Sequence, residues 1–371
     1  MAPLVLGLDI GGANLKAATA GGRAVSVPFA LWKQPDGLPA ALAALVAQFP
    51  DATEFAVTMT GELCDCFETK RAGVHAILDA VESAAAGRPV RVWSTDGAFV
   101  SVDEARCDYL KVAAANWHAL ATFAGRYAPD EGGLLVDVGS TTTDIIPLLY
   151  GVPNTTGRTD PARLRNGELV YCGVRRTPVC AVVNEGVCAE LFATTQDVYV
   201  VLGLIPEEAS DRDTADGRPL TVEYSLARLA RMLGGDSETL ADHAVIDFAT
   251  RVHGALLASV VAAARRVRLD MPTLRTVIVS GQGEFLGRRA VERLLGETRV
   301  DRIVSLHAEL GPDVSACGPA YAVAVLAGEE PNPPRPLPWE GRGRQNRKAS
   351  RPAAYHNTTH LFPTPETRRR S

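Results

Sequence analysis

The sequence predicts an α/β fold of two lobes around a cleft, and three observations lead to this prediction. An apolar strand, an aspartate, a glycine-led polar turn and a second apolar strand occur together twice, over residues 4–20 and 135–149. Apolar runs of strand length alternate with helical segments, which is typical of a sheet with crossover helices. A late apolar strand runs into a Gly-x-Gly turn in LRTVIVSGQGEFLG, at residues 274–287.

The N-terminal half predicts one sheet with helices between its later strands. In order, we expect strand-turn-strand-strand at 3–31, a helix at 38–48, a strand at 54–63, a helix at 68–86, a strand at 90–95 and a helix at 113–127. This last helix leads into the strand that opens the second hairpin. We therefore predict an N-terminal lobe over residues 1–133.

The C-terminal half predicts a second lobe over residues 134–328. Its segment at about 151–220 is polar, rich in turns and rich in arginine, and is interpreted as strands and loops inserted over the cleft. Beyond it we expect helices at 221–233 and 237–268, the strand and turn at 274–287 with a helix after them, a strand at 302–305 and a final helix rich in small residues.

The two hairpin turns have the chemistry of phosphate-binding loops. LDIGGANLKAA and VDVGSTTTDII share the order apolar, Asp, apolar, Gly. Glycine lets backbone N–H groups approach anionic oxygens, and successive amides form an anion-binding nest. An ordinary hairpin turn would explain either copy alone, but not both. The phosphate contacts predicted from the two turns are Gly11, Gly12, Asn14, Gly139, Ser140, Thr141 and Thr142.

Carboxylates beside these turns predict a metal. Asp9 and Asp137 are candidates to hold Mg²⁺, mostly through its bound water, because Mg²⁺ keeps much of its hydration shell. Asp144 is a catalytic candidate, with a turn-capping aspartate as the alternative. Since side chains alternate along a strand, one of the hydroxyls at residues 141–143 should face the phosphates and another should face the protein.

Composition narrows the class of protein. An apolar content of 46% with 22% charged residues is that of a globular chain. The longest apolar or small stretch, residues 254–264, is too short to cross a bilayer, and the N-terminus has no basic region of a signal peptide. Seven cysteines without an export signal argue against a disulfide framework. We expect a cytoplasmic protein that does not bind a membrane.

The C-terminal tail, residues 329–371, has a composition of its own. From residue 331 onward it carries nine Lys or Arg against two acidic residues, with repeated Pro and Gly and no periodicity. Such a composition predicts disorder. A basic tail can touch nucleic acid, but we favour a dispensable extension and expect no specific nucleic-acid partner. The oligomeric state stays open.

The paired Asp-x-Gly loops and the later Ser-Gly-x-Gly turn resemble the acetate kinase, sugar kinase, Hsp70 and actin superfamily. That resemblance covers residues 3–328 and implies an actin-like ATPase (ribonuclease H-like) fold with a phosphate-binding cleft. It also implies that Lys16, seven residues after Asp9, contacts phosphate and assists catalysis. The resemblance further adds Gly281 and Gly283 to the phosphate-binding candidates, in a third turn at 280–283 that faces a nucleoside.

Longer segments resemble a narrower family. DVGSTTTDI is similar to the second loop of hydantoinase A and oxoprolinase proteins. GRTDPARLRNGELVYCGVRRTPV, LFATTQDVYVVLG and AVTMTGELCDCF resemble the subfamily linked to tetrahydromethanopterin-dependent one-carbon metabolism, whose archaeal relatives act in methanofuran biosynthesis. The resemblance implies a transferase that joins an aminomethylfuran diphosphate to the phenol of γ-glutamyltyramine and releases diphosphate. Its partners are small molecules.

Candidate substrate groups follow from this resemblance. Arg176 and Glu168 are favoured for recognition of the γ-glutamyl group, since arginine binds a carboxylate in bidentate fashion. Arg163 and Asn116 are further substrate candidates, and His118 is a candidate base, although a helix histidine often has only a structural role. If the leaving group is diphosphate, the third turn meets no adenine and should tolerate bulk better than the first two loops.

Two other classes of function use the same loops. An ATP-dependent kinase or a hydantoinase/oxoprolinase-type hydrolase would turn over ATP, although such hydrolases are much longer chains. A scaffold protein would bind nucleotide without releasing diphosphate from a small substrate. The sequence leaves open whether ATP binds.

Overall fold

The computed structural model describes residues 4–130, 132–269, 271, 273–295 and 300–329. The tail for which disorder is predicted lies outside these residues, apart from its first residue. The first sheet, in the order β3-β2-β1-β4-β5-β6, comprises β1 (Val5–Ile10), β2 (Asn14–Thr19), β3 (Ala24–Pro28), β4 (Glu54–Met59), β5 (Val90–Trp93) and β6 (Phe99–Val100). Its helices are α1 (Leu38–Val46), α2 (Lys70–Ala85), α3 (Val102–Cys107) and α4 (Tyr109–Val112).

The second sheet repeats the plan of the first. Its order is β10-β8-β7-β11-β12, with β9 paired to β8, and its strands are β7 (Gly133–Val138), β8 (Thr143–Leu149), β9 (Val152–Pro153), β10 (Leu169–Val170), β11 (Thr276–Ser280) and β12 (Arg302–Ser305). In both sheets an antiparallel hairpin, β1–β2 or β7–β8, is followed by two parallel strands. The predicted α/β fold, with two actin-like lobes, is confirmed by this duplicated topology.

Loops make up most of the segment at 151–220, as expected, but three short helices that the sequence did not predict lie among them. The segment contains the short strands β9 and β10 together with α6 (Asp160–Asn166), α7 (Val179–Val182) and α8 (Thr195–Val201), and the helix expected at 221–233 is α9 (Val222–Met232). The apolar residues of α8 and α9 pack with the long helix α10 (Asp242–Leu269) in one core cluster. The helical period of α6, α7 and α8 was hidden because these helices are only four to seven residues long.

Helix α10 is long and apolar enough to cross a membrane by length and composition. This helix contains the stretch 254–264, whose length in the sequence was interpreted as too short to cross a bilayer. Its buried face, which includes Val252, Leu256 and Val260, belongs to the core of the second lobe together with residues of β7 and β11. A core helix of this kind passes the same test.

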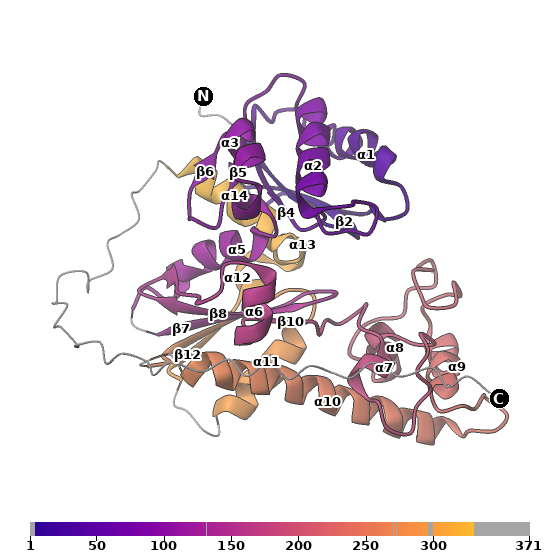
Figure 1. The fold of residues 1–371 in the computed structure, drawn as a ribbon. Coiled ribbons are helices and arrows are strands. Elements are labelled where there is room, and N and C mark those ends of the chain that lie inside the picture. The colour runs from indigo at the N-terminus through magenta and orange to yellow at the C-terminus, as the bar shows by residue number, and fades with distance from the viewer. Residues whose placement is uncertain (1–3, 131, 270, 272, 296–299, 330–371) are drawn as a thin grey trace, which may run out of the picture. The chain divides into compact units, whose positions relative to one another are not determined.

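Two helices lie between the sheets and join the lobes (Figure 1). α5 (Asn116–Ala124) packs Leu120 against the second sheet and Phe123 against the first. α14 (Gly318–Gly328), from the end of the described chain, returns to β1, β2 and β4. A Cβ at Gly7 would lie 1.9 Å from the Ala320 carbonyl oxygen, so a glycine is required for this approach. The remaining helices are α11 (Glu284–Leu295), α12 (Leu306–Leu310) and α13 (Pro312–Ala316).

Candidate active site

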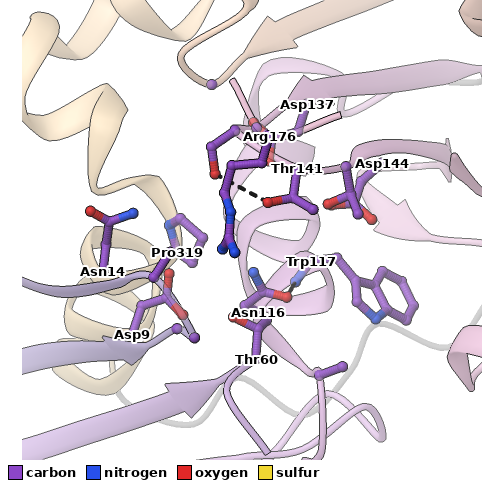
Figure 2. Close-up of a pocket in the computed structure, with 18 of the residues that line it drawn as sticks. Asp9, Asn14, Thr60, Asn116, Trp117, Asp137, Thr141, Asp144, Arg176 and Pro319 are labelled. Carbon is purple, nitrogen blue, oxygen red and sulfur yellow. Dashed lines mark hydrogen bonds between the residues drawn. The ribbon is translucent and has the colours of Figure 1, made fainter. Parts of the chain in front are cut away.

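The two predicted phosphate loops lie on the same pocket, a cleft of about 430 Å³. Asp9 and Asn14 come from the first hairpin, and Asp137 and Thr141 come from the second (Figure 2). Arg176 extends between them in the same view. The sequence repeat therefore corresponds to two loops that face one cavity.

The loops have the same backbone closure. The Gly11 N–H donates to the Asn14 carbonyl at 3.0 Å, and the Gly139 N–H donates to the Thr142 carbonyl at 2.8 Å. In each hairpin the aspartate is the next-to-last residue of a buried strand and lies two positions before the glycine. Each hairpin thus carries its aspartate into the cleft at an equivalent place.

A further turn supports each loop from the neighbouring parallel strand. After β4, the N–H groups of Thr60 and Gly61 donate to the Ile10 carbonyl at 2.9 and 3.0 Å. After β11, the Gly283 N–H donates to the Val138 carbonyl at 2.8 Å. Because the carboxyl ends of parallel strands meet at one sheet edge, both turns reach the ligand side of the cleft.

Segment 173–176 holds the second loop in place. Val174 N–H donates to the Gly139 carbonyl at 3.0 Å, and Arg176 N–H donates to the Ser140 carbonyl at 2.9 Å. The Thr143 hydroxyl turns inward and donates to the Cys172 carbonyl at 2.6 Å, whereas Thr141 and Thr142 line the pocket. The predicted division of the threonine hydroxyls between cleft and protein is confirmed.

The carboxylates of the cleft are buried and electrostatically unequal. Burial raises the pKa of Asp137 to about 6, and the nearby Asp144 carboxylate adds to the rise. Burial also raises the pKa of Asp9, while Lys16, its cross-strand partner, opposes this. Oδ1 of Asp9 is buried without a hydrogen-bond partner among the described residues. Asp137 thus faces a second acid and Asp9 keeps an oxygen without a donor, so a cation bound between the loops would stabilise both carboxylates.

These residues fit a hard divalent cation. Oxygen ligands from two carboxylates, with Thr or Ser hydroxyls nearby, suit Mg²⁺ that keeps several waters. Within the described residues no three His, Cys, Asp or Glu side chains converge as a metal cluster. The protein itself would thus contribute few direct ligands, and water would contribute the rest.

Arg163 and Asp144, predicted as substrate and catalytic groups, bind each other. An Arg163 guanidinium nitrogen lies 2.6 Å from an Asp144 carboxylate oxygen, and both residues are buried. The guanidinium also lies 4.0 Å from the centre of the Trp117 ring. Both residues line the pocket, but their charges neutralise each other, so their first role is to hold α6 against β8.

Three predicted site residues do not line the pocket. His118 accepts a hydrogen bond on Nδ1 from the Trp93 indole at 3.3 Å, and burial lowers its pKa to about 4, so its prediction as a catalytic base is corrected to a packing role. Glu168 accepts N–H bonds from Thr156 and Gly157 at 2.6 and 2.9 Å, so its carboxylate organises that loop instead of a substrate. Gly283, at the end of the third turn, packs against Val138 and Val174.

The third turn is sterically restricted, contrary to the expected tolerance of bulk. Gly281 has φ +87°, and a Cβ there would lie 2.3 Å from the Val138 carbonyl oxygen and 2.7 Å from Asp137 Oδ1. A Cβ at Gly139 would meet its nearest atom at 3.3 Å. The restriction at Gly281 comes from the protein itself and is independent of any nucleoside.

Several lining residues were missed by the sequence analysis. They are Trp32, the β4–α2 turn residues Thr60, Glu62, Leu63, Cys64 and Asp65, and the insertion residues Asp160 and Tyr171. A signal existed for the turn, because a strand that follows a crossover helix usually lies parallel to its neighbour and then ends at the same edge as the first loop. No signal existed for Trp32, whose ring meets Arg176 at 4.5 Å. Of the substrate candidates, Asn116 and Arg176 line the pocket.

Comparison with known proteins identifies the class of protein to which this fold and these loops belong. The family model for hydantoinase/oxoprolinase matches residues 54–322, and the chain belongs to this family. A Methanocaldococcus jannaschii protein is 37% identical over 87% of this chain and 97% of its own length. It is a (4-{4-[2-(gamma-L-glutamylamino)ethyl]phenoxymethyl}furan-2-yl)methanamine synthase.

A second relative carries the same name. The Methanococcus vannielii protein is 32% identical over 55% of this chain and 94% of its own length. Both relatives are synthases, and this chain is accordingly an enzyme of the synthase and transferase class.

Among solved structures, component A of the Acidaminococcus fermentans (R)-2-hydroxyglutaryl-CoA dehydratase is similar. Its identity to this chain is 13%, the match covers 88% of this chain and 98% of that chain, and the TM-score is 0.42.

Proposed function

We propose that this chain forms the aryl ether for which its relatives are named, in methanofuran or methylofuran biosynthesis. The phenol oxygen of γ-glutamyltyramine attacks the methylene carbon of an aminomethylfuran diphosphate. The new carbon–oxygen bond replaces the bond to diphosphate, which leaves with the electron pair, and the phenol proton passes to a base. The observation that carries the proposal is the pair of equivalent loops facing one cleft.

The cleft is suited to stabilise the leaving group. Glycine turns offer backbone N–H groups, Thr141 and Thr142 offer hydroxyls, and Lys16 offers a cation. Donors fixed in advance around a developing anion are usually the largest contribution to catalysis. Asp9 and Asp137 would hold Mg²⁺, which when bound neutralises negative charge on the departing oxygens. Arg176 and Lys16 also favour ionisation of the phenol, whose ordinary pKa is near 10.

An ATP-dependent reaction is the second candidate, favoured by a neighbouring cavity. A space of about 670 Å³ shares Gly281 and Gln282 with the cleft and continues along α11, where Phe285 and Arg288 line it. It lies beyond the third turn, which in the actin-like superfamily faces a nucleoside. Purified protein that turns over ATP in the presence of a small substrate would support this kinase or hydrolase alternative.

One assay separates the two. The protein is incubated with Mg²⁺, γ-glutamyltyramine and the aminomethylfuran diphosphate, and the products are analysed by mass spectrometry. We expect the ether and one diphosphate per ether, with diphosphate inhibiting more strongly than ATP. ATP hydrolysis without ether formation would overturn the proposal.

A cytoplasmic location remains a prediction.

A further inference from the structure

The β4–α2 turn brings a carboxylate into the cleft that the ether-forming step does not use. Thr60 and Gly61 fix the start of this turn against the end of β1. The next residue, Glu62, lines the cleft with only 1% of its surface exposed. Helix α2 packs on its backbone so closely that a Cβ at Gly73 would lie 2.1 Å from the Glu62 carbonyl oxygen. The position of Glu62 is therefore fixed on both sides.

One oxygen of this carboxylate has a partner and the other has none. Oε1 lies 3.4 Å from the Lys70 ammonium, whereas Oε2 is buried without a hydrogen-bond partner in the described part of the chain. A buried carboxylate oxygen without a donor is strongly unfavourable, so such an atom in a cleft points to a ligand that donates to it. Burial also raises the pKa of Glu62, while Lys70 opposes this.

The charge around Glu62 selects a cation. Lys70 lies 3.1 Å from an Asp160 carboxylate oxygen as well, so one ammonium is shared between two carboxylates from different lobes. Asp160 lines the same cleft. The cluster of Glu62, Lys70 and Asp160 thus carries a net negative charge, which would repel a phenolate and attract an ammonium group.

We propose that Glu62, together with Asp160, binds the primary ammonium of the furan substrate. This inference rests on the proposed function and names the subsite for one of its two substrates. The name of the relatives' product ends in methanamine, so the amine stays free through the reaction and is available for recognition. With the ammonium held at Glu62, the furan ring is oriented with its reactive methylene toward the loops, and furans without the amine are rejected.

The test compares two furan diphosphates that differ only in the replacement of the aminomethyl group by an ethyl group. For the wild-type protein we expect kcat/KM to be roughly 100-fold higher with the amine, since a charge-assisted hydrogen bond in a buried site has about this effect. Glu62→Gln should reduce the preference to within about threefold, by raising KM for the amine without changing KM for the phenol. Glu68→Gln, the same change on an exposed residue of the same turn, should keep the preference.

The contrary outcomes are distinct. Equal use of both furans by the wild-type protein overturns this inference and leaves the proposed function standing. A fall in kcat for both furans in Glu62→Gln, with the preference retained, would make Glu62 a base and also overturns it. If Glu62→Gln does not fold, as judged by thermal unfolding, Asp160→Asn should reduce the preference at least about tenfold; an unchanged preference there contradicts the proposal.

A binding measurement distinguishes failure of this inference from failure of the proposed function. If no ether forms from either furan, calorimetry with the aminomethylfuran alcohol and its ethyl counterpart still reports on the subsite. Binding of the amine alone, lost in Glu62→Gln, supports the ammonium site without the reaction. Equal binding of both alcohols overturns it.

Discussion

In the first hairpin the residue opposite the aspartate is Lys16, whereas in the second it is Asp144. The backbones of the two turns close in the same way, so this exchange of a cation for an acid is the main difference in charge between them. Asp9 therefore has a partner of opposite charge on its own hairpin. Asp137 has a second acid there, and that acid is already paired with Arg163.

This difference shows how one loop geometry can serve two purposes. With Lys16, the first loop supplies positive charge toward phosphate oxygens. With its surplus of carboxylates, the second loop attracts a cation, which in turn attracts phosphate. The residue opposite the aspartate therefore decides the net charge that each copy of the turn brings to the cleft.

The largest expected effect is on turnover when either aspartate is neutralised. Asp9→Asn and Asp137→Asn should each lower ether formation at least about a hundredfold, a loss of roughly 2.7 kcal/mol in transition-state stabilisation. If the second loop carries the metal, Asp137→Asn should also raise the Mg²⁺ concentration needed for half-maximal activity more than Asp9→Asn does. Initial rates over a Mg²⁺ titration measure both effects. Near-wild-type turnover in both variants would refute the metal assignment.

The turns that support the loops should differ in their tolerance of a side chain. Gly281→Ala places a Cβ against the backbone of β7 at positive φ, which should cost about 3–4 kcal/mol of unfolding free energy. In Gly61→Ala, the nearest atom, at 2.8 Å, is a terminal methyl group of Leu31 that can move, and about 1 kcal/mol is expected. Urea unfolding of the two variants tests this. Equal losses would show that the third turn is not the tighter support.

The ion pair beneath the second loop should matter for stability. Arg163→Met leaves Asp144 buried without its counter-charge, and loss of one partner of a buried pair costs about 3 kcal/mol. Arg165→Met, on the exposed face of the same helix, should stay within about 0.5 kcal/mol of wild type. Chemical unfolding measures both. If the two variants lose the same stability, the Arg163–Asp144 pair does not support the second loop.

The stability of the apoprotein should depend on pH through the second loop. The folded-state pKa of Asp137, about 6, lies above that of an unfolded aspartate. Its contribution to the free energy of unfolding is therefore present below about pH 4 and is lost as pH rises through 6. In chelator at pH 8, Asp137→Asn should therefore be more stable than wild type, on the order of 2 kcal/mol, with no difference near pH 4. Asp9→Asn should gain less, because it leaves Lys16 without its partner. A larger gain for Asp9→Asn would reverse the assignment of charge to the loops.

The smallest effect should follow removal of the tail. Truncation after Glu329 retains its ion pair with Arg126 and removes only residues whose composition predicts disorder. Because the truncation should leave both loops unchanged, the melting transition and the rate of ether formation should also be unchanged. Loss of cooperative melting in the truncated protein would show that the tail packs on the body.

The sequence by itself determined the repeated hairpins and most of the strands. The strand predicted at 302–305 coincides with β12, and both Asp-x-Gly turns line the cleft as predicted. Local signals suffice for these features, because an apolar run, an aspartate and a glycine turn act within one hairpin. The shared order of the two copies also predicted a duplicated fold.

Only the tertiary structure decided which charges meet. Arg163 and Asp144 are 19 residues apart and belong to different elements, and Lys70 and Asp160 come from different lobes. Long-range pairing of this kind leaves no period or spacing in a single sequence. For the same reason His118 and Glu168 were predicted for the site yet have partners elsewhere, and Glu62 was missed. The sequence determined the loops, but the packing of distant segments decided what faces them.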